Sequence, residues 1–455
     1  MSTGIEDYFS ELGATSIVLF MAPFVLLLLS IATLPLIFPH FWEKHRNKAV
    51  VSLFFGLPIA IFFLYRDWQT LADTLLDYGA FLSLLGTLFI ISGGIYIRGS
   101  FAGRPMVNTL FLLVGSVLAN LIGTTGASML LIRPMIRANQ NRQRKIHIII
   151  FFIFIVSNGG GLLTPLGDPP LFLGFLKGVD FAWTLRLWPQ WLTVVGVLLV
   201  VFNLVERYQF SKEAVVARAI PAREENPLAD RFGIEGMHNF IFLAMVVGLI
   251  LFSGYVIYPL EGSIILGEHP GAVMSKVVQM VGMGLITLAS YKVTHKTIRH
   301  RNSFSFGPWI EVAVLFAGIF MAMIPALLIL ETQGGKLGVN HPAQYFWITG
   351  ALSGFLDNAP TYLTFTSLAQ GALQLPGEGL QGLVDDSTGG LFLAAISCGA
   401  VFMGANTYIG NGPNFMVKAI AEEAKIKMPS FFGYMAWSLP ILIPLFIAVT
   451  FIFFR

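Results

Sequence analysis

The sequence has a single cysteine and very little charge. Cys398 is the only cysteine, so no intramolecular disulfide framework can hold the chain together. Charged residues make up only 12% of the 455 positions, and the formal net charge is +3. The basic residues fall in short clusters between apolar runs, so the chain lacks the basic face that nucleic-acid binding requires. Nucleic acid is therefore not an expected partner.

Long apolar runs take the place of charge. Hydrophobic residues make up 55% of the sequence and the mean hydropathy is +0.74, with repeated runs long enough to cross a bilayer. The start of the chain is acidic and lacks the basic residues of a cleavable signal, so the first run is expected to remain as a membrane helix. The sequence predicts an all-α polytopic membrane protein with spans near residues 15–38, 48–65, 79–97, 146–176, 189–206, 237–258, 273–291, 309–330, 389–418 and 430–454.

The distribution of basic residues orients these spans. The loop 39–48 carries Lys44, Arg46 and Lys48, whereas 66–78 carries mainly acids, so the first of these loops is expected in the cytoplasm. With five spans in each half, both termini are then expected outside. We expect a multi-pass protein of a bacterial inner membrane.

Two further apolar segments are expected to enter the membrane and leave on the same side. Basic residues flank the segment 106–132 at both ends, including Arg104 and Arg133, and a simple crossing would export one of these clusters. This segment is therefore predicted to form a re-entrant hairpin from the cytoplasm that turns near Gly123. The segment 343–373 has almost no basic flanks, so it is predicted to form the opposite hairpin from outside.

Glycine and proline interrupt two of the predicted spans at corresponding places. The first interruption covers residues 157–170 and the second covers 403–414. An unwound backbone in hydrocarbon leaves N–H and C=O groups unpaired, which is tolerated only where the backbone lines a cavity or packs against protein. Paired interruptions of this kind are typical of the substrate site of a secondary transporter.

The two halves align with each other. We predict inverted repeats over 1–206 and 236–455, joined by a cytoplasmic linker at 207–235. Each repeat is expected to contain five spans and one hairpin. In this alignment Asp168 falls on Asn411, 243 positions later (411 − 168 = 243).

Two acids lie inside segments that are otherwise apolar. Asp357 stands at the predicted tip of the second hairpin, where a carboxylate is by default a proton or cation carrier, the alternative being a cap for the next helix. Asp168 lies in the first interruption, and both a functional role and an ordinary turn before Pro169 are open. Lys276 and Glu311 lie near span ends and are expected at the membrane interface.

Uncharged oxygen ligands accompany these acids. Each hydroxyl or amide is a candidate for ion or substrate binding, with local backbone hydrogen bonding as the alternative. Na⁺ prefers hard oxygen ligands, and a sodium site is predicted at Asp357, Thr124, Thr125, Asn406 and Thr407. The other candidates are Asn158, Thr164, Asn358, Thr361, Asn411 and Asn414.

These features resemble the ion transporter superfamily, and within it the NhaD-type sodium/proton antiporters and the neighbouring citrate transporters. The opposed hairpins, the tip sequence 357–361 and the broken helix 158–170 carry the resemblance. The resemblance implies a homodimer and an elevator mechanism, in which hairpins and broken helices carry the substrate past a scaffold. The tips at 123–125 and 357–359 differ from the Ser-Asn-Thr tips of the superfamily's dicarboxylate carriers, and an acid there would repel a dianion.

The sequence therefore predicts a Na⁺/H⁺ antiporter in which a carboxylate binds either ion. Membrane lipid, Na⁺ and H⁺ are the expected partners; we expect no cofactor besides Na⁺ as transported or coupling ion, and no enzymatic activity. A cation-coupled symporter of citrate or a similar carboxylate is the alternative. An intramembrane aspartyl protease using Asp168 and Asp357 is more remote, because Pro165 stands where the first glycine of its Gly-x-Gly-Asp signature belongs.

Overall fold

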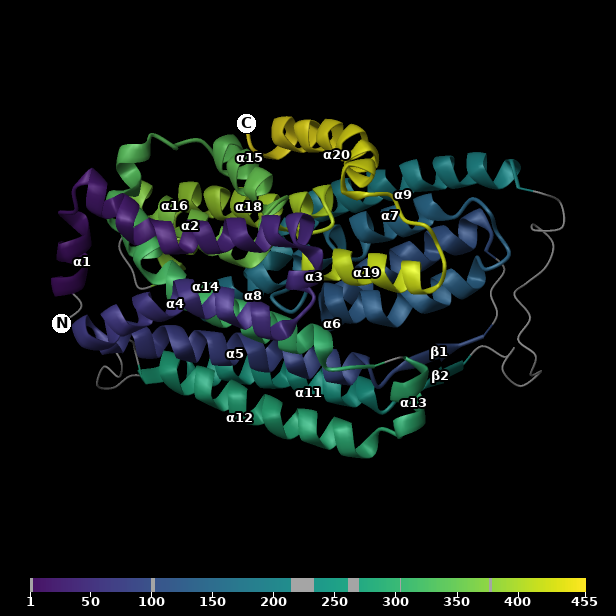
Figure 1. The fold of residues 1–455 in the computed structure, drawn as a ribbon, viewed down its shortest axis with the longest axis horizontal. Coiled ribbons are helices and arrows are strands. Elements are labelled where there is room, and N and C mark those ends of the chain that lie inside the picture. Colours follow the sequence, from purple (N-terminus) through teal and green to yellow (C-terminus); the bar gives the residue numbers. More distant parts are fainter. Residues whose placement is uncertain (1–2, 100–102, 214–232, 261–269, 303, 376–378) are drawn as a thin grey trace.

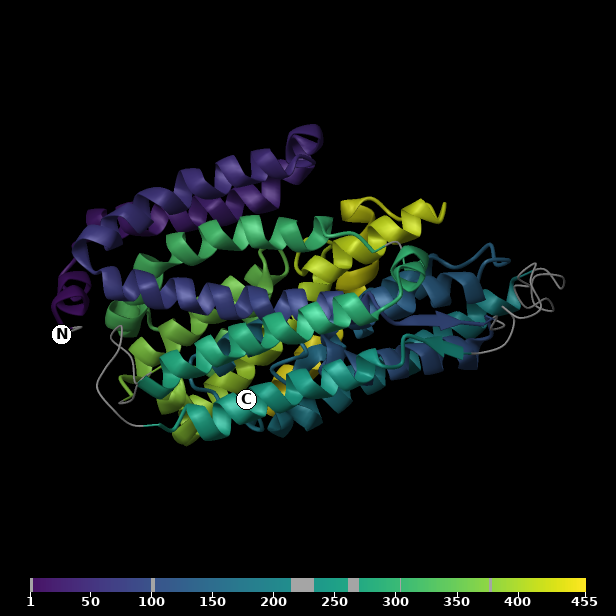
Figure 2. The ribbon, with the colours of Figure 1, turned by 90° about the horizontal axis from the view of Figure 1, so that it is seen from below.

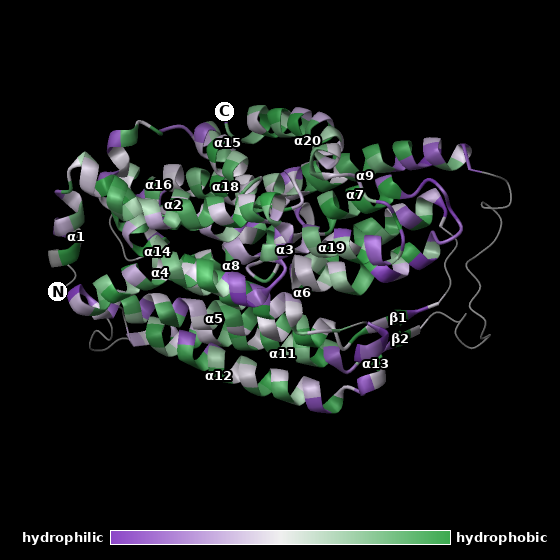
Figure 3. Cartoon of the chain, in the orientation of Figure 1, coloured by the Kyte–Doolittle hydropathy of each residue, from purple (hydrophilic) through white to green (hydrophobic). Residues whose placement is uncertain are grey.

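The protein is an elongated bundle of helices that run mainly along its long axis (Figure 1). The computed structural model describes residues 3–99, 103–213, 233–260, 270–302, 304–375 and 379–455. Among these residues, 11 helical segments are long and apolar enough to cross a membrane. Apolar residues line the helices, and hydrophilic residues gather at the end of the bundle near β1, β2 and α13 (Figure 3). The prediction of an all-α polytopic membrane protein is confirmed.

The first half of the chain supplies three long helices, a long bent helix, an interrupted helix and a final long helix. Its elements are α1 (Thr3–Ser10), α2 (Ala14–Ile37), α3 (Pro39–Trp42), α4 (His45–Arg66), α5 (Trp68–Ser92), β1 (Tyr96–Arg98), α6 (Pro105–Ala138), α7 (Ile146–Ile155), η1 (Gly159–Leu163), α8 (Pro169–Leu176), η2 (Trp183–Leu187) and α9 (Trp188–Ser211).

The second half follows a related order. Its elements are β2 (Gly233–Glu235), α11 (Asn239–Phe252), the π-helical turn η3 (Ser253–Ile257), α12 (Pro270–Val293), α13 (Lys296–Arg301), α14 (Gly307–Gln333), η4 (Gly334–Leu337), α15 (Pro342–Ser353), α16 (Asn358–Leu373), α17 (Gln381–Asp385), α18 (Ser387–Met403), η5 (Gly404–Asn406), α19 (Gly412–Glu423) and α20 (Phe431–Phe453).

Helix α6 reverses direction within its length. Gly123 has φ +76° and ψ 156°, a conformation that interrupts the helix and that glycine adopts readily. The side chains of Asn108 and Asn139, at the two ends of α6, exchange hydrogen bonds of 2.9 Å. The predicted segment 106–132 is therefore a helical hairpin with its turn at Gly123, and its depth in a bilayer stays a prediction.

Helices α15 and α16 form the second hairpin, over residues 342–373. Its turn lies between Ser353 and Asn358, and Asp357 caps the second helix by accepting a hydrogen bond from the backbone N–H of Ala359 at 3.1 Å. Sequence analysis expected this hairpin at 343–373, one residue from the observed start.

Both predicted interruptions are present. The first separates α7 from α8 through η1, and the second separates α18 from α19 through η5. Within each interruption the backbone folds back so that two glycines lie in close contact. A methyl group on Gly167 would collide with the carbonyl oxygen of Gly161, and a methyl group on Gly410 would lie 2.5 Å from the carbonyl oxygen of Gly404. Gly404 and Gly410 of the second break lie 243 positions after Gly161 and Gly167 of the first (404 − 161 and 410 − 167). The two breaks therefore have the same backbone design.

The helices form two groups. In the first group, which we call the frame, α4 packs along α14, α12 along α5, α2 against α4 and α14, and α11 against α12 and α5. The second group, which we call the hairpin–break unit, contains α6 to α9 and α15 to α20, with α18 between the two arms of the second hairpin. Contacts of α16 with α14, and of α6 and α8 with α5, join the two groups. Figure 2 shows the N-terminal helices of the frame along one flank of the bundle.

Three features differ from the sequence prediction. Helix α5 begins at Trp68 rather than at residue 79, because two acids assigned to a loop are paired with lysines and so fit within a helix. Strands β1 and β2 form a small antiparallel sheet with Tyr96 opposite Glu235. Helix α9 extends to Ser211, into the predicted linker, most of which (214–232) lies outside the described residues.

Candidate functional site

Asp168 is the point at which both hairpins and both breaks meet. Its carboxylate is 1% exposed and precedes α8. Oδ1 accepts hydrogen bonds from the hydroxyl of Thr124 (2.8 Å) and the amide of Asn411 (3.2 Å), and Oδ2 accepts one from the amide of Asn358. Thr124 comes from the first hairpin tip, Asn358 from the second, and Asn411 from the second break. Four of the predicted site residues therefore share one hydrogen-bonded cluster.

The local sequence explains why Asp168 points into this cluster. The break turns back on itself through a hydrogen bond from Gly167 N–H to the carbonyl of Thr164 (2.9 Å), and Pro169 then begins α8. The backbone N–H of Thr124 donates to the carbonyl of Gly167 at 2.8 Å. The first hairpin tip thus docks onto the break through its backbone as well as through the Thr124 side chain.

Hydrogen bonds between asparagine side chains join the two breaks next to Asp168. Asn158 donates to Asn414 Oδ1 at 2.7 Å, and Asn411 donates to Asn158 Oδ1 at 3.3 Å. Asn414 in turn donates to the carbonyls of Gly404 (2.9 Å) and Thr407 (3.0 Å). These bonds satisfy unwound backbone that has no helical partner, so Asn158 and Asn414 support the site rather than face an open space.

Thr164 and Thr407 play equivalent structural roles. The Thr164 hydroxyl donates to the carbonyl of Asn120 in the first hairpin at 2.5 Å, and Thr407 donates to that of Gly354 in the second at 2.6 Å. Each threonine therefore ties a break to the hairpin of its own half. Asn120, which the sequence analysis did not single out, also accepts a hydrogen bond from Leu163 N–H at 2.8 Å; a lone amide in an apolar hairpin was the available signal.

Asp357 lies beside the cluster without joining it. Its carboxylate caps α16, and its carbonyl accepts a hydrogen bond from the hydroxyl of Thr361 at 2.9 Å. It is half-buried and close enough to Asp168 for the two carboxylates to interact electrostatically. Thr125 is partly exposed, and its hydroxyl makes no hydrogen bond within the described residues. The acid that the sequence analysis emphasised is thus a neighbour, and Asp168 is the centre.

The acids of the site have neutral hydrogen-bond donors but no basic partner. Among the described residues, no Lys, Arg or His forms an ion pair with Asp168 or Asp357. The side-chain oxygens of Asn358 and Asn406 are buried and receive no hydrogen bond within the same residues. A buried carboxylate and orphaned amide oxygens present negative potential, which a cation or a proton can neutralise.

Two expectations about charges near span ends are incomplete. Lys276 is buried rather than solvated, because its side chain is 2% exposed and forms ion pairs with Asp73 and Asp77 on α5. Glu311 is partly exposed as expected, yet it pairs with the buried Lys48. Both lysines find their partners on helices from the other half of the chain, which the position of each residue within its own span could not reveal.

Comparison with known proteins agrees with this architecture. No curated protein matches the chain. Residues 13–454 match the model of a protein family described as "Putative citrate transport". Because the match covers nearly the whole chain, from α2 to α20, the protein belongs to this family and is a secondary membrane transporter.

Proposed function

We propose that the protein is a Na⁺/H⁺ antiporter in which Asp168 binds the two ions alternately. The carrying observation is that the tips of both hairpins and both breaks converge on this one buried carboxylate and bring no basic side chain to it among the described residues. A carboxylate that can hold either a proton or a cation, but not both, enforces exchange by competition.

Uncharged oxygens complete the cation shell. Asn358 of the second hairpin and Asn406 of the second break have side-chain oxygens that accept no hydrogen bond from the described residues. Thr124 has its hydroxyl oxygen beside Asp168. Hard cations such as Na⁺ are held by carboxylate, amide and hydroxyl oxygens of this kind.

A carboxylate symporter is the second candidate, and the family description favours it. The N-termini of α8, α16 and α19 meet at the site and would attract an anion. Two aspartates at the same place oppose this, because they repel a di- or trianion unless a cation binds with it. Asp168 and Asp357 make no hydrogen bond to each other, so the shared proton of an aspartyl protease has no counterpart here.

The two groups of helices suit an elevator mechanism. The hairpin–break unit contains every element of the site, whereas the frame contributes none of its hydrogen bonds. We propose that this unit moves against the frame, and that the frame holds two copies together as a homodimer in an inner membrane. The repeats at 1–206 and 236–455 belong to the same proposal.

Proteoliposomes with an internal pH dye test the function. Added Na⁺ or Li⁺ should release protons in the parent protein, and Asp168→Asn should abolish this response. Asp357→Asn should reduce it less, because asparagine also caps helices. Asp385→Asn, at an exposed acid of α17, is the matched control and should behave as the parent does. Uptake of labelled citrate with no cation-dependent proton movement would instead establish the symporter.

A further inference from the structure

Four charged side chains form a cluster away from the Asp168 site. Asp73 and Asp77 lie one helical turn apart on α5. Lys276 of α12 contacts both, with Nζ–Oδ distances of 2.5 and 2.8 Å. Lys177, which follows the last residue of α8, also contacts both, at 3.2 and 2.6 Å. Each of the two ammonium groups is therefore paired with both carboxylates.

The cluster is largely buried. The side chains of Lys276 and Asp77 are 2% and 5% exposed, and that of Lys177 is 29% exposed. Charges this far from water are stable only with partners, so loss of one ammonium leaves negative charge poorly compensated. Without Lys177, both carboxylates would lose one ion pair and keep the one that each forms with Lys276.

Lys177 joins the two groups of helices. Its backbone belongs to the hairpin–break unit, since it caps α8 and its carbonyl accepts a hydrogen bond from Leu380 N–H at 2.6 Å. Its ammonium reaches α5 of the frame. Of the ion pairs formed between described residues, only those of Lys177 connect the unit with the frame.

A related ion pair elsewhere in the frame lacks this third member. Lys48 of α4 pairs with Glu311 of α14, just as Lys276 of α12 pairs with Asp73 of α5. In the proposed repeats α4 corresponds to α12 and α14 to α5, so the two pairs are counterparts. Among described residues, only the α12–α5 pair also receives a cation from the hairpin–break unit. The contact made by Lys177 therefore distinguishes the α12–α5 pair from the α4–α14 pair.

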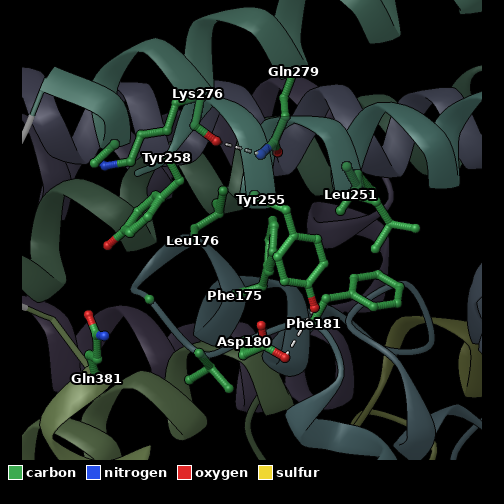
Figure 4. Close-up of a pocket in the computed structure, with 16 residues that line it drawn as sticks. Phe175, Leu176, Asp180, Phe181, Leu251, Tyr255, Tyr258, Lys276, Gln279 and Gln381 are labelled. Atoms are coloured by element: carbon green, nitrogen blue, oxygen red, sulfur yellow. Dashed lines mark hydrogen bonds between the residues drawn. The ribbon is translucent and has the colours of Figure 1, made fainter. Parts of the chain in front are cut away.

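A cavity of about 170 Å³ lies beside the cluster. One side of the cavity is lined by Lys276 and Gln279 of α12 (Figure 4). Another side is lined by Phe175 and Phe181, which precede and follow Lys177 in the sequence. The segment that carries Lys177 is therefore incompletely packed against α11 and α12. Besides the ion pairs, a hydrogen bond of 3.3 Å from the Tyr255 hydroxyl of η3, which continues α11, to Asp180 attaches the segment at this place.

We propose that Lys177 is a charge latch that holds the hairpin–break unit against the Asp73–Asp77 pair of the frame in this conformation and must release it for the unit to move. The latch rests on the movement proposed above. Lys276 of α12 stays paired with the acids of α5 after release.

Site-directed labelling tests the latch without measuring transport. Replacing Cys398 by serine gives a cysteine-free background, and Leu251→Cys then places one thiol on α11 at the edge of the cavity. Lys177→Gln should raise the maleimide labelling rate of this thiol about tenfold by shifting the conformational equilibrium. Lys177→Arg should retain the parent rate. Lys336→Gln, which removes an exposed lysine near α14, is the control and should also leave the rate unchanged.

Asp77→Asn provides a second way to open the latch and should also raise the rate, so that misfolding of one variant does not decide the result. An unchanged rate in folded Lys177→Gln, or an equal increase in Lys177→Arg, would overturn the latch. The experiment distinguishes failure of the latch from failure of the proposed function. If labelling responds as expected but the parent protein does not exchange Na⁺ for H⁺, the latch is supported and the antiport function is rejected.

Discussion

The two breaks share a backbone design and differ in charge. Glycines 161 and 167 repeat at 404 and 410, and threonines 164 and 407 each hold the hairpin of their own half. Yet Asp168 in the first break stands where the second break has Asn411, and the two side chains are hydrogen-bonded to each other at 3.2 Å. Two corresponding positions of the breaks thus lie together, and the difference between their residues leaves one carboxylate there instead of two.

The largest expected effect comes from the backbone that the breaks share. Gly167→Ala would drive a methyl group into the carbonyl of Gly161, so the free energy of unfolding should fall by about 3 kcal/mol. Gly410→Ala, with a 2.5 Å approach to the carbonyl of Gly404, should be similarly harmful. Thermal unfolding in detergent measures both. Gly196→Ala, in α9 with open space around it, is the control and should not destabilise the protein.

The second prediction removes the difference in charge. Asn411→Asp would place two carboxylates within hydrogen-bonding distance, and they cannot both ionise, so Na⁺-driven proton release should fall about tenfold or more. The exchanged variant, Asp168→Asn with Asn411→Asp, restores a single carboxylate and should recover part of the activity lost in Asp168→Asn. If the exchanged variant is as inactive as Asp168→Asn alone, the two positions are not interchangeable.

The third prediction compares neighbouring threonines at the first hairpin tip. Thr124 donates to the carboxylate of Asp168, whereas Thr125 has no such contact. Thr124→Ala should lower the exchange rate about tenfold, in line with the loss of a hydrogen bond to a charged group. Thr125→Ala should stay within about twofold of the parent. Equal losses in the two variants, measured by proton release at saturating Na⁺, would remove Thr124 from the binding cluster.

The smallest expected effects test whether the two breaks are equally anchored. Thr164→Val deletes one buried hydrogen bond to a hairpin carbonyl, so it should lower the free energy of unfolding by about 1 kcal/mol. Thr407→Val deletes the corresponding bond and also the bonds that the Thr407 hydroxyl accepts from the N–H groups of Ile409 and Gly410, so it should cost about 2 kcal/mol. The loss in Thr407→Val should be the larger of the two, and thermal unfolding in detergent measures both. A loss confined to one variant would show that only one hairpin is held by its break.

Much of the architecture was predictable because it depends on local sequence. Gly123 in an apolar segment with basic flanks predicts a turn, and the clustered glycines and prolines near 160 and 405 predict breaks, since a continuous helix there is unfavourable. The candidates Thr124, Asn358 and Asn411 were identified for the same reason: polar side chains are rare in apolar spans. All three lie against Asp168.

The errors arose where the partner of a charge lies far away in sequence. Asp73 and Asp77 favoured a loop when read alone, but they lie in a helix, where Lys177 and Lys276, about 100 and 200 positions later, pair with both. The sequence analysis emphasised Asp357, whose carboxylate has a local partner in Ala359 N–H, and its role in ion binding stays a prediction. The carboxylate of Asp168 accepts hydrogen bonds only from other elements, and no local sequence pattern predicts those partners.

By itself, the sequence determined that this chain crosses a membrane, that two of its segments turn back and that two helices are broken, because apolar length, flanking charge and the backbone limits of glycine and proline act over a few residues. Only the tertiary structure decided which acid occupies the centre and which lysines are buried. Those outcomes depend on the pairing of charges and hydrogen-bonding groups between segments 40 to 250 positions apart, and the free energy of a buried charge is set by the partners that packing brings to it.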